Sequence, residues 1–360
     1  MPKIAWENNI LGFIPKTDWL DIPFNPTRQN DPADILFGDK KTDNLVAEWE
    51  SIAAEYQIPV MAQFHGFDTE AQTTFRVPID THNIEKGLIK VKLNQSERLR
   101  ALIDRGIQGE SQLYNYVLND GFRLADQVFT RSKVAKNELL ATGKVTIKEN
   151  NLNLTVDYGV PSSQTNKTLD VGVGQDIAAQ IQTIIDAALA KGVIITGMVT
   201  ARTNLTKMRK NLGLQKAING NAQAGQLVSM AALQAYLQEE FGISRIVVND
   251  LTYALPNPTY SNGRPNITQK RYFPETKITF FGITMGNTLG TGLWGNPPEA
   301  DAQVTPFIDG AQSADRPFVY VSQWAEKDPA VLWTKASALY MPVLYSPDSL
   351  WIATVSETTE

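Results

Sequence analysis

The feature that most constrains the fold is a long amphipathic segment at residues 111–141. This one-sided stripe predicts a single helix of about 30 residues, roughly 45 Å long at 1.5 Å per residue. A helix of that length is longer than a small domain is wide. Ser111 is placed to cap its start, Gly143 to end it, and Gly121 marks a point where it could bend. The apolar residues of the stripe recur at spacings of four and seven: Leu113, Val117, Leu124, Val128, Ala135 and Leu139.

A small polar hairpin is predicted directly behind this helix, in the stretch TGKVTIKENNLNLTVDYGVP at residues 142–161. Val145 and Ile147 would share one face of its first strand, with the turn near Glu149 and Asn150. The other face carries polar and charged residues. The second strand would supply the matching apolar face with Leu152, Leu154 and Val156.

The N-terminal part of the chain has the composition of an arm followed by a ribbon. Residues 1–44 are rich in Pro, Asn and Asp, with scattered aromatic residues of the kind that anchor a segment on another surface. Further on, Thr73–Val77 and Leu88–Leu93 read as two strands, each with one apolar face, around a polar middle. Alone in water such a ribbon would be marginally stable, so it should lie on something.

A compact mixed domain is predicted over about residues 176–325. Its signals are a helix with an isoleucine stripe from residue 177, a basic helix near 204–216, a helix at 227–241 and strands at 245–248 and in KITFFGITM. The last segment, SALYMPVLYSPDSLWIATV, reads as two strands around a turn at Ser346-Pro347-Asp348. Pro342 indicates an edge position for the first of them.

Composition and charge exclude several classes of function. The 360 residues carry a net charge of −5, which gives no overall footprint for nucleic acid or an anionic membrane. The chain has no cysteine, so thiolate catalysis, disulfides and cysteine metal sites are absent. It also shows neither a secretory signal nor an apolar run long enough for a membrane span, so a soluble protein is expected.

The sequence contains no complete motif for a catalytic, cofactor-binding or metal-binding site, and no residue is assigned such a role. His65 and His82 lie 17 residues apart, without metal-site spacing. Gly172-Val173-Gly174 resembles the opening of a dinucleotide loop but lacks its third glycine. The remaining partial patterns read as structural or solvated: half-made serine elbows at Ser111 and Ser244, a broken phosphate loop at Gly143-Lys144, the basic cluster Lys207-Met208-Arg209-Lys210, and Glu239-Glu240.

Three stretches in order resemble one protein family. NELLATGKVTIKENNLNLTVDYGVP is similar to the end of a long helix and the short strand pair behind it in the lambda-type phage major capsid protein E family. YSNGRPNITQKRYFPETKITFFG is similar to that family's loop and F-P-x-x strand entry. ASALYMPVLYSPDSLWIATV is similar to its P-D turn and closing strand. The resemblance spans nearly the whole chain and is weakest over the first 50 residues.

The resemblance implies an α+β protein with the Hong Kong 97 fold of tailed-phage major capsid proteins. It implies no enzyme, but a subunit that assembles with itself into hexamers and pentamers of an icosahedral shell around the DNA genome. Its parts would be an N-terminal arm at 1–50, an extended loop at 51–95, a peripheral domain with spine helix and hairpin at 96–175, an axial domain at 176–325, and C-terminal strands at 326–360 that return to the peripheral domain. The apolar face of the hairpin would pack back on the spine helix, so that Leu154→Asp should abolish stability as well as assembly.

The same resemblance implies partners and a place. The chain would belong to the virion, assembled in the bacterial host cytoplasm with separate scaffold, portal and decoration proteins, and would touch packaged DNA weakly and without sequence preference. No membrane contact is implied. Some relatives in the wider fold crosslink a lysine of the extended loop to a neighbour; Lys86, Lys90 and Lys92 are available, but no matching Asn and Glu is found, so no crosslink is expected.

Two other functions remain open from the residues. A soluble nucleotide-binding enzyme acting through Gly172–Gly174 would explain the compact second domain. Another phage structural protein, such as a tail-tube subunit, would share the logic of self-assembly but would not need a 30-residue helix beside a separate domain.

Overall fold

The fold was analysed in a computed structural model of the chain. The described residues are 31–54, 58, 60–62, 74, 76–95, 112–223, 225–261, 264–283, 288–300, 309–313, 316–328 and 330–358. The N-terminal aromatic residues up to Phe24, His65, Ser111 and most of the predicted strand at 73–77 therefore lie outside the described part.

The predicted long helix is present as α3 (Gln112–Thr142), and Gly121 does not interrupt it. Its described apolar stripe is buried, with Val128 and Leu139 fully so. Gly143 ends the helix in a left-handed conformation, at φ 71°, and its N–H donates to the Leu139 carbonyl at 2.8 Å. A side chain at position 143 would meet Val160, so glycine is required there for space as well as for φ.

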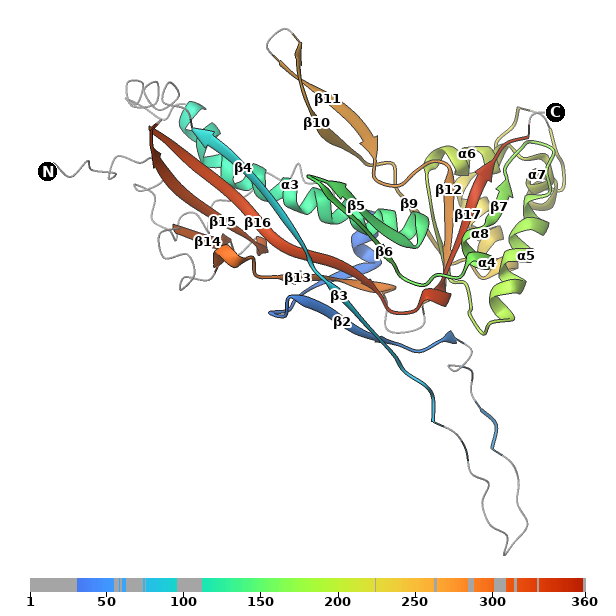
Figure 1. The fold of residues 1–360 in the computed structure, drawn as a ribbon. Helices are drawn as coiled ribbons and strands as arrows, with labels where there is room; N and C mark the ends of the chain where they lie inside the picture. Colours follow the sequence, from blue (N-terminus) through green and yellow to red (C-terminus); the bar gives the residue numbers. More distant parts are fainter. Residues whose placement is uncertain are drawn as a thin grey trace, which may run out of the picture.

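One face of a six-stranded sheet packs along α3 (Figure 1). β16 (Ala330–Leu344) is its central strand, with β4 on one side and with β13 and β15 following one another on the other side. β1 pairs parallel to β13. The remaining strands are β1 (Phe37–Lys41), β4 (Gly87–Gln95), β13 (Gly290–Gly295), β14 (Asp309–Ser313) and β15 (Arg316–Lys327).

A second sheet of five strands, in the order β7-β17-β12-β8-β9, carries helices on one face (Figure 1). Its strands are β7 (Lys167–Asp170), β8 (Gly197–Thr200), β9 (Arg245–Val248), β12 (Lys277–Phe281) and β17 (Leu350–Ser356). The helices are α5 (Ile177–Leu189), α6 (Arg202–Lys210), α7 (Leu212–Asn219) and α8 (Met230–Phe241). Short helices complete the chain: η2 (Pro32–Ile35), α4 (Ser162–Thr165), η4 (Pro298–Ala300) and η5 (Pro347–Ser349).

Strand alternation joins the two parts into one packed body. On β12, Phe280 faces the core under α5–α8, whereas Phe281 faces the core around α3. The end of α3 packs against that second face, where the Thr279 hydroxyl donates to the Leu140 carbonyl at 2.7 Å. The five-stranded sheet is therefore covered by helices on both sides.

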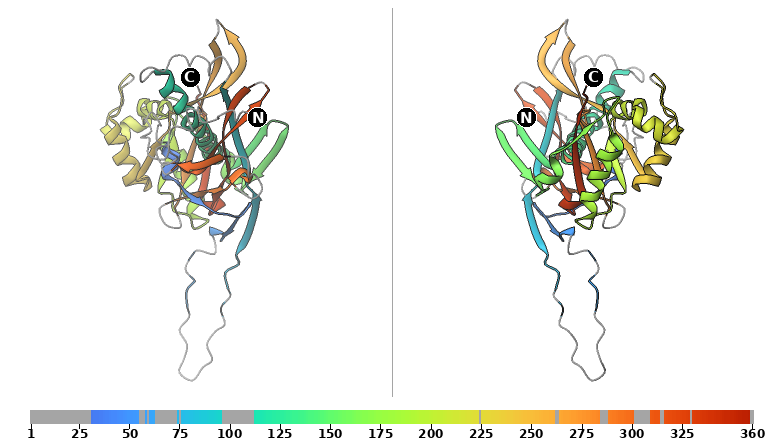
Figure 2. Two further views of the ribbon diagram at one scale, coloured as in Figure 1. Left: turned by 90° about the vertical axis from the view of Figure 1, so that its left-hand side faces the viewer. Right: turned by 90° about the vertical axis from the view of Figure 1, so that its right-hand side faces the viewer.

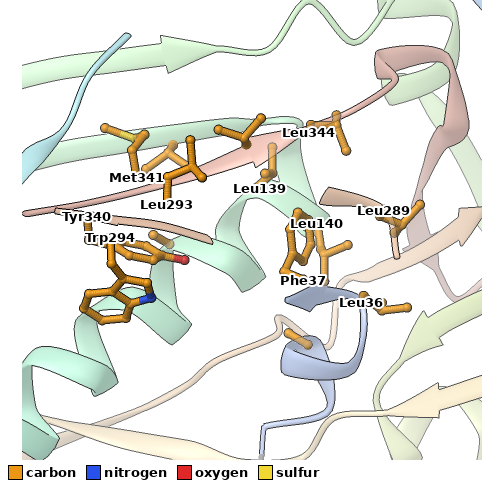
Figure 3. Packing of buried hydrophobic residues seen from close by; sticks show 14 of the residues in the cluster. Leu36, Phe37, Leu139, Leu140, Leu289, Leu293, Trp294, Tyr340, Met341 and Leu344 are labelled. Carbon is orange, nitrogen blue, oxygen red and sulfur yellow. The ribbon is translucent and has the colours of Figure 1, made fainter. Parts of the chain in front are cut away.

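The core around α3 is dense in large side chains. In Figure 3, Leu140 of α3 lies beside Phe37 of β1, and Trp294 of β13 lies beside Tyr340 of β16 farther along the same cluster. The Trp294 ring lies 4.5 Å from that of Tyr340, measured between centroids. Full burial of one such side chain is worth about 1.5–3 kcal/mol, so this cluster is a main source of stability.

Three ribbons of two strands each complete the fold. They are β2 (Val46–Ser51) with β3 (Asp80–Glu85), β5 (Lys144–Glu149) with β6 (Leu152–Asp157), and β10 (Thr252–Ser261) with β11 (Arg264–Arg271). The β5–β6 ribbon is the predicted hairpin; its turn is Asn150-Asn151, both at positive φ.

The N-terminal expectations need correction. Residues 31–50 are not a peripheral arm, because Leu36 and Phe37 are fully buried and β1 belongs to the sheet along α3. The ribbon pairs β2 with β3 rather than 73–77 with 88–93; of the former stretch, the described residues lie in no strand. The predicted strand at 88–93 is present as β4, but it pairs with β16.

The C-terminal half also divides differently from the prediction. Residues 290–295 and 316–325, expected in the second domain, form β13 and most of β15 in the sheet along α3. Of the two closing strands only β16 lies in that sheet. β17 inserts between β7 and β12, because its alternating side chains Trp351 and Ile352 fill the cores on opposite faces of the second sheet.

Pro342 was expected to mark an edge strand, yet β16 is central. The structure resolves the conflict locally, since β4 ends at the pair Tyr340 and Gly87. The Pro342 carbonyl accepts a 2.6 Å hydrogen bond from the Tyr158 hydroxyl. Because the N and C=O of one strand residue point to the same side, the missing N–H of Pro342 faces that hydroxyl and breaks no ladder bond.

Candidate assembly surfaces

A buried network of polar side chains holds together the elements that carry the surfaces of the molecule. Asp31 accepts hydrogen bonds from the Ala33 N–H at 2.8 Å, from Asn137 Nδ2 at 2.7 Å and from Asn249 Nδ2 at 2.9 Å. Asn249 also donates to Asn137 Oδ1 at 2.8 Å. Burial raises the pKa of Asp31 above its usual value, against the lowering effect of the hydrogen bonds from Ala33 and Asn137. The network ties the N-terminal segment, α3 and the loop after β9 together.

A second buried group anchors the same segment through charge. Lys136, on α3, is 1% exposed and lies 2.9 Å from Asp34 and 3.0 Å from Asp39. Asp39 also accepts from Trp294 Nε1 at 2.9 Å. In both networks the polar side chains bind one another, as buried polar groups generally do. Their effect is to hold the N-terminal segment against α3.

The β2–β3 ribbon has one buried and one exposed face. On the inner face Trp49 stacks on His82 at 5.1 Å between ring centroids and packs, with Ile84, against the core around α3. On the outer face Glu48, Glu50 and Glu85 are exposed and lie on the same side of the ribbon. Within the described residues none of these three carboxylates forms an ion pair. We call them the acidic strip.

The β5–β6 hairpin is buried at its base and exposed toward its tip. Val145 and Val156 pair across the strands and are 1% and 5% exposed. Leu152 and Leu154, expected to be core residues on the matching face, are 61% and 46% exposed instead. The apolar tip extends past the side of α3, so its outer half has no covering surface among the residues that the structure describes.

His82 is engaged within the β2–β3 ribbon. His82 Nε2 is 2.8 Å from the Ser51 hydroxyl, and its ring is held by Trp49. His65 lies outside the described residues. No group of three metal-ligating side chains occurs in the described part of the chain.

The Gly172-Val173-Gly174 turn is filled by the protein itself. Asn211 Nδ2 donates to the carbonyls of Gly172 at 2.8 Å and Gln175 at 2.7 Å. A side chain at Gly172 would meet the Thr358 carbonyl. A strand, β7, precedes the turn, but Asp176 already caps α5 by accepting from the Ala179 N–H at 3.0 Å. The turn is thus a structural junction.

The partial motifs for other chemistry also prove structural. Ser244 donates from its hydroxyl to the Thr196 carbonyl at 3.2 Å. Lys144, after the helix-ending Gly143, pairs with Asp157 at 2.8 Å. Glu239 and Glu240 are exposed on α8.

The basic cluster on α6 is not one continuous cationic face. Lys207 pairs with Glu357 at 2.7 Å, and Arg209 donates to the Val228 carbonyl at 2.6 Å. Met208 between them is buried, and Lys210 is exposed.

The three lysines considered for crosslinking differ in access. Lys86 is buried, and its ammonium donates to the carbonyls of Thr42 at 3.0 Å and Asn44 at 2.5 Å. Burial lowers the pKa of Lys86, against the raising effect of Asp43. Lys90 and Lys92 are exposed, and Lys92 lies over the Trp333 ring at 4.2 Å.

Sequence reasoning missed both the polar network and the acidic strip. The residues of the network are more than 100 positions apart, and no periodicity links Asp31 to Asn137 and Asn249. The strip did carry a signal, since the stretch VAEWES at 46–51 alternates polar and apolar residues from Ala47 onward, as a half-buried strand does.

Comparisons with known proteins agree on one family and one fold. The model of the family described as phage major capsid protein E matches residues 92–355. The putative capsid protein of a prophage of E. coli CFT073 is a structural neighbour with a TM-score of 0.54 and 14% identity, covering 94% of this chain and 97% of its own.

A phage-related protein from Bordetella bronchiseptica RB50 is a second neighbour, with a TM-score of 0.51 and 9% identity, covering 94% of this chain and 95% of its own. No curated protein sequence matches. No described helix is long and apolar enough to cross a membrane. The family match covers well over half of the residues, and the neighbours share the Hong Kong 97 fold. The chain therefore belongs to the phage major capsid protein E family, a family of structural capsid proteins.

Proposed function

We propose that this capsid subunit builds hexamers and pentamers of an icosahedral shell around the phage genome. The observation that carries the proposal is the pairing of one rigid body with several ribbons that the body leaves partly uncovered. Leu152 and Leu154 on one ribbon and Ile267 on another are exposed apolar residues, of the kind that become buried between subunits. The family match to residues 92–355 supports the same function.

The proposal assigns a place in the shell to each part. The sheet along α3, with the β5–β6 hairpin, would be the peripheral domain. The five-stranded sheet with α5–α8 would be the axial domain, pointing at the capsomer axis. Within the expected extended loop at 51–95, the part before β4 would lie over a neighbour, rooted in the β2–β3 ribbon, because β4 belongs to the sheet along α3. The residues before η2 would be the N-terminal arm.

Partners other than the chain itself follow from the same proposal. Scaffold, portal and decoration proteins would be separate chains, and assembly would take place in the host cytoplasm before the virion is complete. Contact with packaged DNA would be weak and non-specific, because the chain has a net charge of −5. Lys86 is engaged with main-chain carbonyls, which supports the expectation that it forms no crosslink.

The test is expression of the chain, alone and with the scaffold candidate from the same genome, followed by sedimentation and electron microscopy. The proposal expects closed shells in at least one condition, without a ladder of oligomers after boiling in detergent. Tubes or single rings would instead support another phage structural role. A stable monomer in every condition would contradict the proposal.

A further inference from the structure

The strands of the β10–β11 ribbon, residues 252–271, pair with no other strand within the described part of the chain. Figures 1 and 2 show it standing away from the body at one end. Its two strands pair only with each other. Leu255 and Ile267 are 37% and 66% exposed, and they lie on opposite faces because their cross-strand neighbours are Thr268 and Pro256. A two-stranded ribbon open on both faces is marginally stable in water, which indicates that a surface covers it in the working state.

The edges of this ribbon disfavour strand addition. Pro256 and Pro258 lie in β10, and Pro265 lies in β11. Each removes a main-chain donor that a third strand would need. The ribbon is therefore suited to docking through the side chains of a face rather than by extending a sheet.

The charges of this ribbon and of the β2–β3 ribbon are opposite. Residues 251–273 include Arg264, Lys270 and Arg271 and no acidic residue. Arg271 is engaged at the root with Asp250 at 2.6 Å and with Glu275 at 2.8 Å, whereas the neighbouring Lys270 is exposed. The strands β2 and β3 carry four acidic residues and no Lys or Arg, and three of the four form the exposed acidic strip.

The two ribbons lie on opposite sides of the subunit. Both views in Figure 2 place β10–β11 at one end and the β2–β3 region toward the other. A ribbon therefore cannot reach the acidic strip of its own chain, but it can reach that of a second copy placed alongside. Two different surfaces on opposite sides produce a head-to-tail contact, which repeats around a ring when the rotation closes.

We propose that the β10–β11 ribbon of one subunit docks on the acidic strip Glu48, Glu50 and Glu85 of the next subunit within a capsomer. This inference rests on the proposed function and adds the contact that orders neighbours around the ring. Opposite charges on the two contacting surfaces contribute to their orientation and to the choice of partner. Salt screens the charges and so weakens this attraction.

A charge swap tests the contact. Arg264→Glu with Lys270→Glu should lower the fraction of subunits in particles about tenfold, because like charges would face each other. Glu48→Lys with Glu85→Lys should do the same. Combining all four substitutions should restore assembly to within roughly twofold of the unmodified chain, since the interaction is then rebuilt with reversed sign. Lys216→Glu, at an exposed position on α7, is the matched control and should assemble normally.

Three results would overturn the inference: a ribbon variant that assembles like the unmodified chain, a strip variant that does so, or a fourfold variant no better than either pair. If circular dichroism shows that the variants do not fold, particles of the unmodified chain provide a second test. They are treated with a carbodiimide, which joins amines to carboxylates that lie in contact. In particles assembled from a mixture of light and heavy subunits, the inference expects a crosslink between Lys270 and the strip in which mixed light–heavy pairs occur in the proportion of random mixing. Pairs of like isotope only, or no such crosslink, would also overturn the inference. Failure of the unmodified chain to form shells under any condition would count against the proposed function instead.

Discussion

At the scale of single residues, the fold depends on polar groups that are buried and paired. Asp31, Asn137 and Asn249 come from three distant parts of the chain, and each is at most 1% exposed. Their hydrogen bonds use both Asp31 oxygens and the Asn137 carbonyl oxygen. A buried donor left without an acceptor costs about 1–3 kcal/mol, so the network is sensitive to a change of a single atom.

Asp31→Asn tests this sensitivity. The substitution replaces one acceptor oxygen with an NH₂ group, which would then face the donor nitrogen of Asn137 or Asn249. We expect the free energy of unfolding of the unassembled subunit to fall by about 1–3 kcal/mol at pH 7 in urea titrations. The control Glu239→Gln, on the exposed side of α8, should change it by less than about 0.5 kcal/mol. An unchanged stability for Asp31→Asn would show that the network does not hold the fold.

The pH dependence of Asp31 has a defined sign. Because burial raises its pKa above 3.8, the folded state holds the proton more tightly than the unfolded state. This contribution favours the folded state below pH 3.8 and is lost as the pH rises through the higher folded value. Asp31 therefore opposes acid unfolding instead of causing it.

Glu299 has the opposite behaviour. Burial alone would raise its pKa, but the hydrogen bond and charge of Lys335 outweigh burial and hold the pKa below 4.5. Its contribution is present above pH 4.5 and is lost as the pH falls through the lower folded value. Glu299→Gln should cost about 1–2 kcal/mol at pH 7, and the difference from the unmodified subunit should shrink at pH 3.5. A difference that is constant with pH would contradict the assignment.

At the scale of elements, the sequence predicts those features that depend on residues close together in the chain. The stripe from Leu124 to Leu139 repeats within one helix, and the glycine that ends it adjoins it, so α3 could be predicted almost to the residue. The hairpin behind it was predictable for the same reason. Strand partners depend on contacts between distant residues, and for that reason β4 was assigned to the wrong partner and β17 to the wrong sheet. Burial of Leu154 was also wrong, because alternation gives the face of a strand but not how far the body extends beneath it.

The hairpin permits a test that separates stability from assembly. Val156 is 5% exposed at the base of the hairpin, whereas Leu154, two residues earlier on the same face, is 46% exposed. Leu154→Asp should leave the melting temperature of the subunit nearly unchanged but abolish particles, because the apolar tip is expected to be buried between subunits. This modifies the prediction from sequence, which expected the variant to lose stability as well.

Val156→Asp is the matched variant, and it should unfold the subunit by burying a charge at the base. The two variants are compared by thermal melting and by electron microscopy of particles. Normal particles from Leu154→Asp would remove the hairpin tip from the interface.

At the scale of the whole molecule, one body carries ribbons that it covers only in part. Phe280 and Phe281 link the cores on the two faces of the second sheet, and the networks around Asp31 and Lys136 hold the N-terminal segment to α3. The body can therefore act as a rigid unit while its ribbons contact neighbours. No active site was predicted from the sequence, and three of the features that hinted at one, His82, the Gly172–Gly174 turn and Ser244, are engaged in internal contacts.

The most direct test of the central claim is a cryo-electron microscopy reconstruction of particles formed by the chain. We predict a closed shell in which α5–α8 and their five-stranded sheet surround the fivefold and sixfold axes, with α3 toward the periphery of each capsomer. A reconstruction in which α3 lines those axes, or an assembly without closed capsomers, would contradict the account.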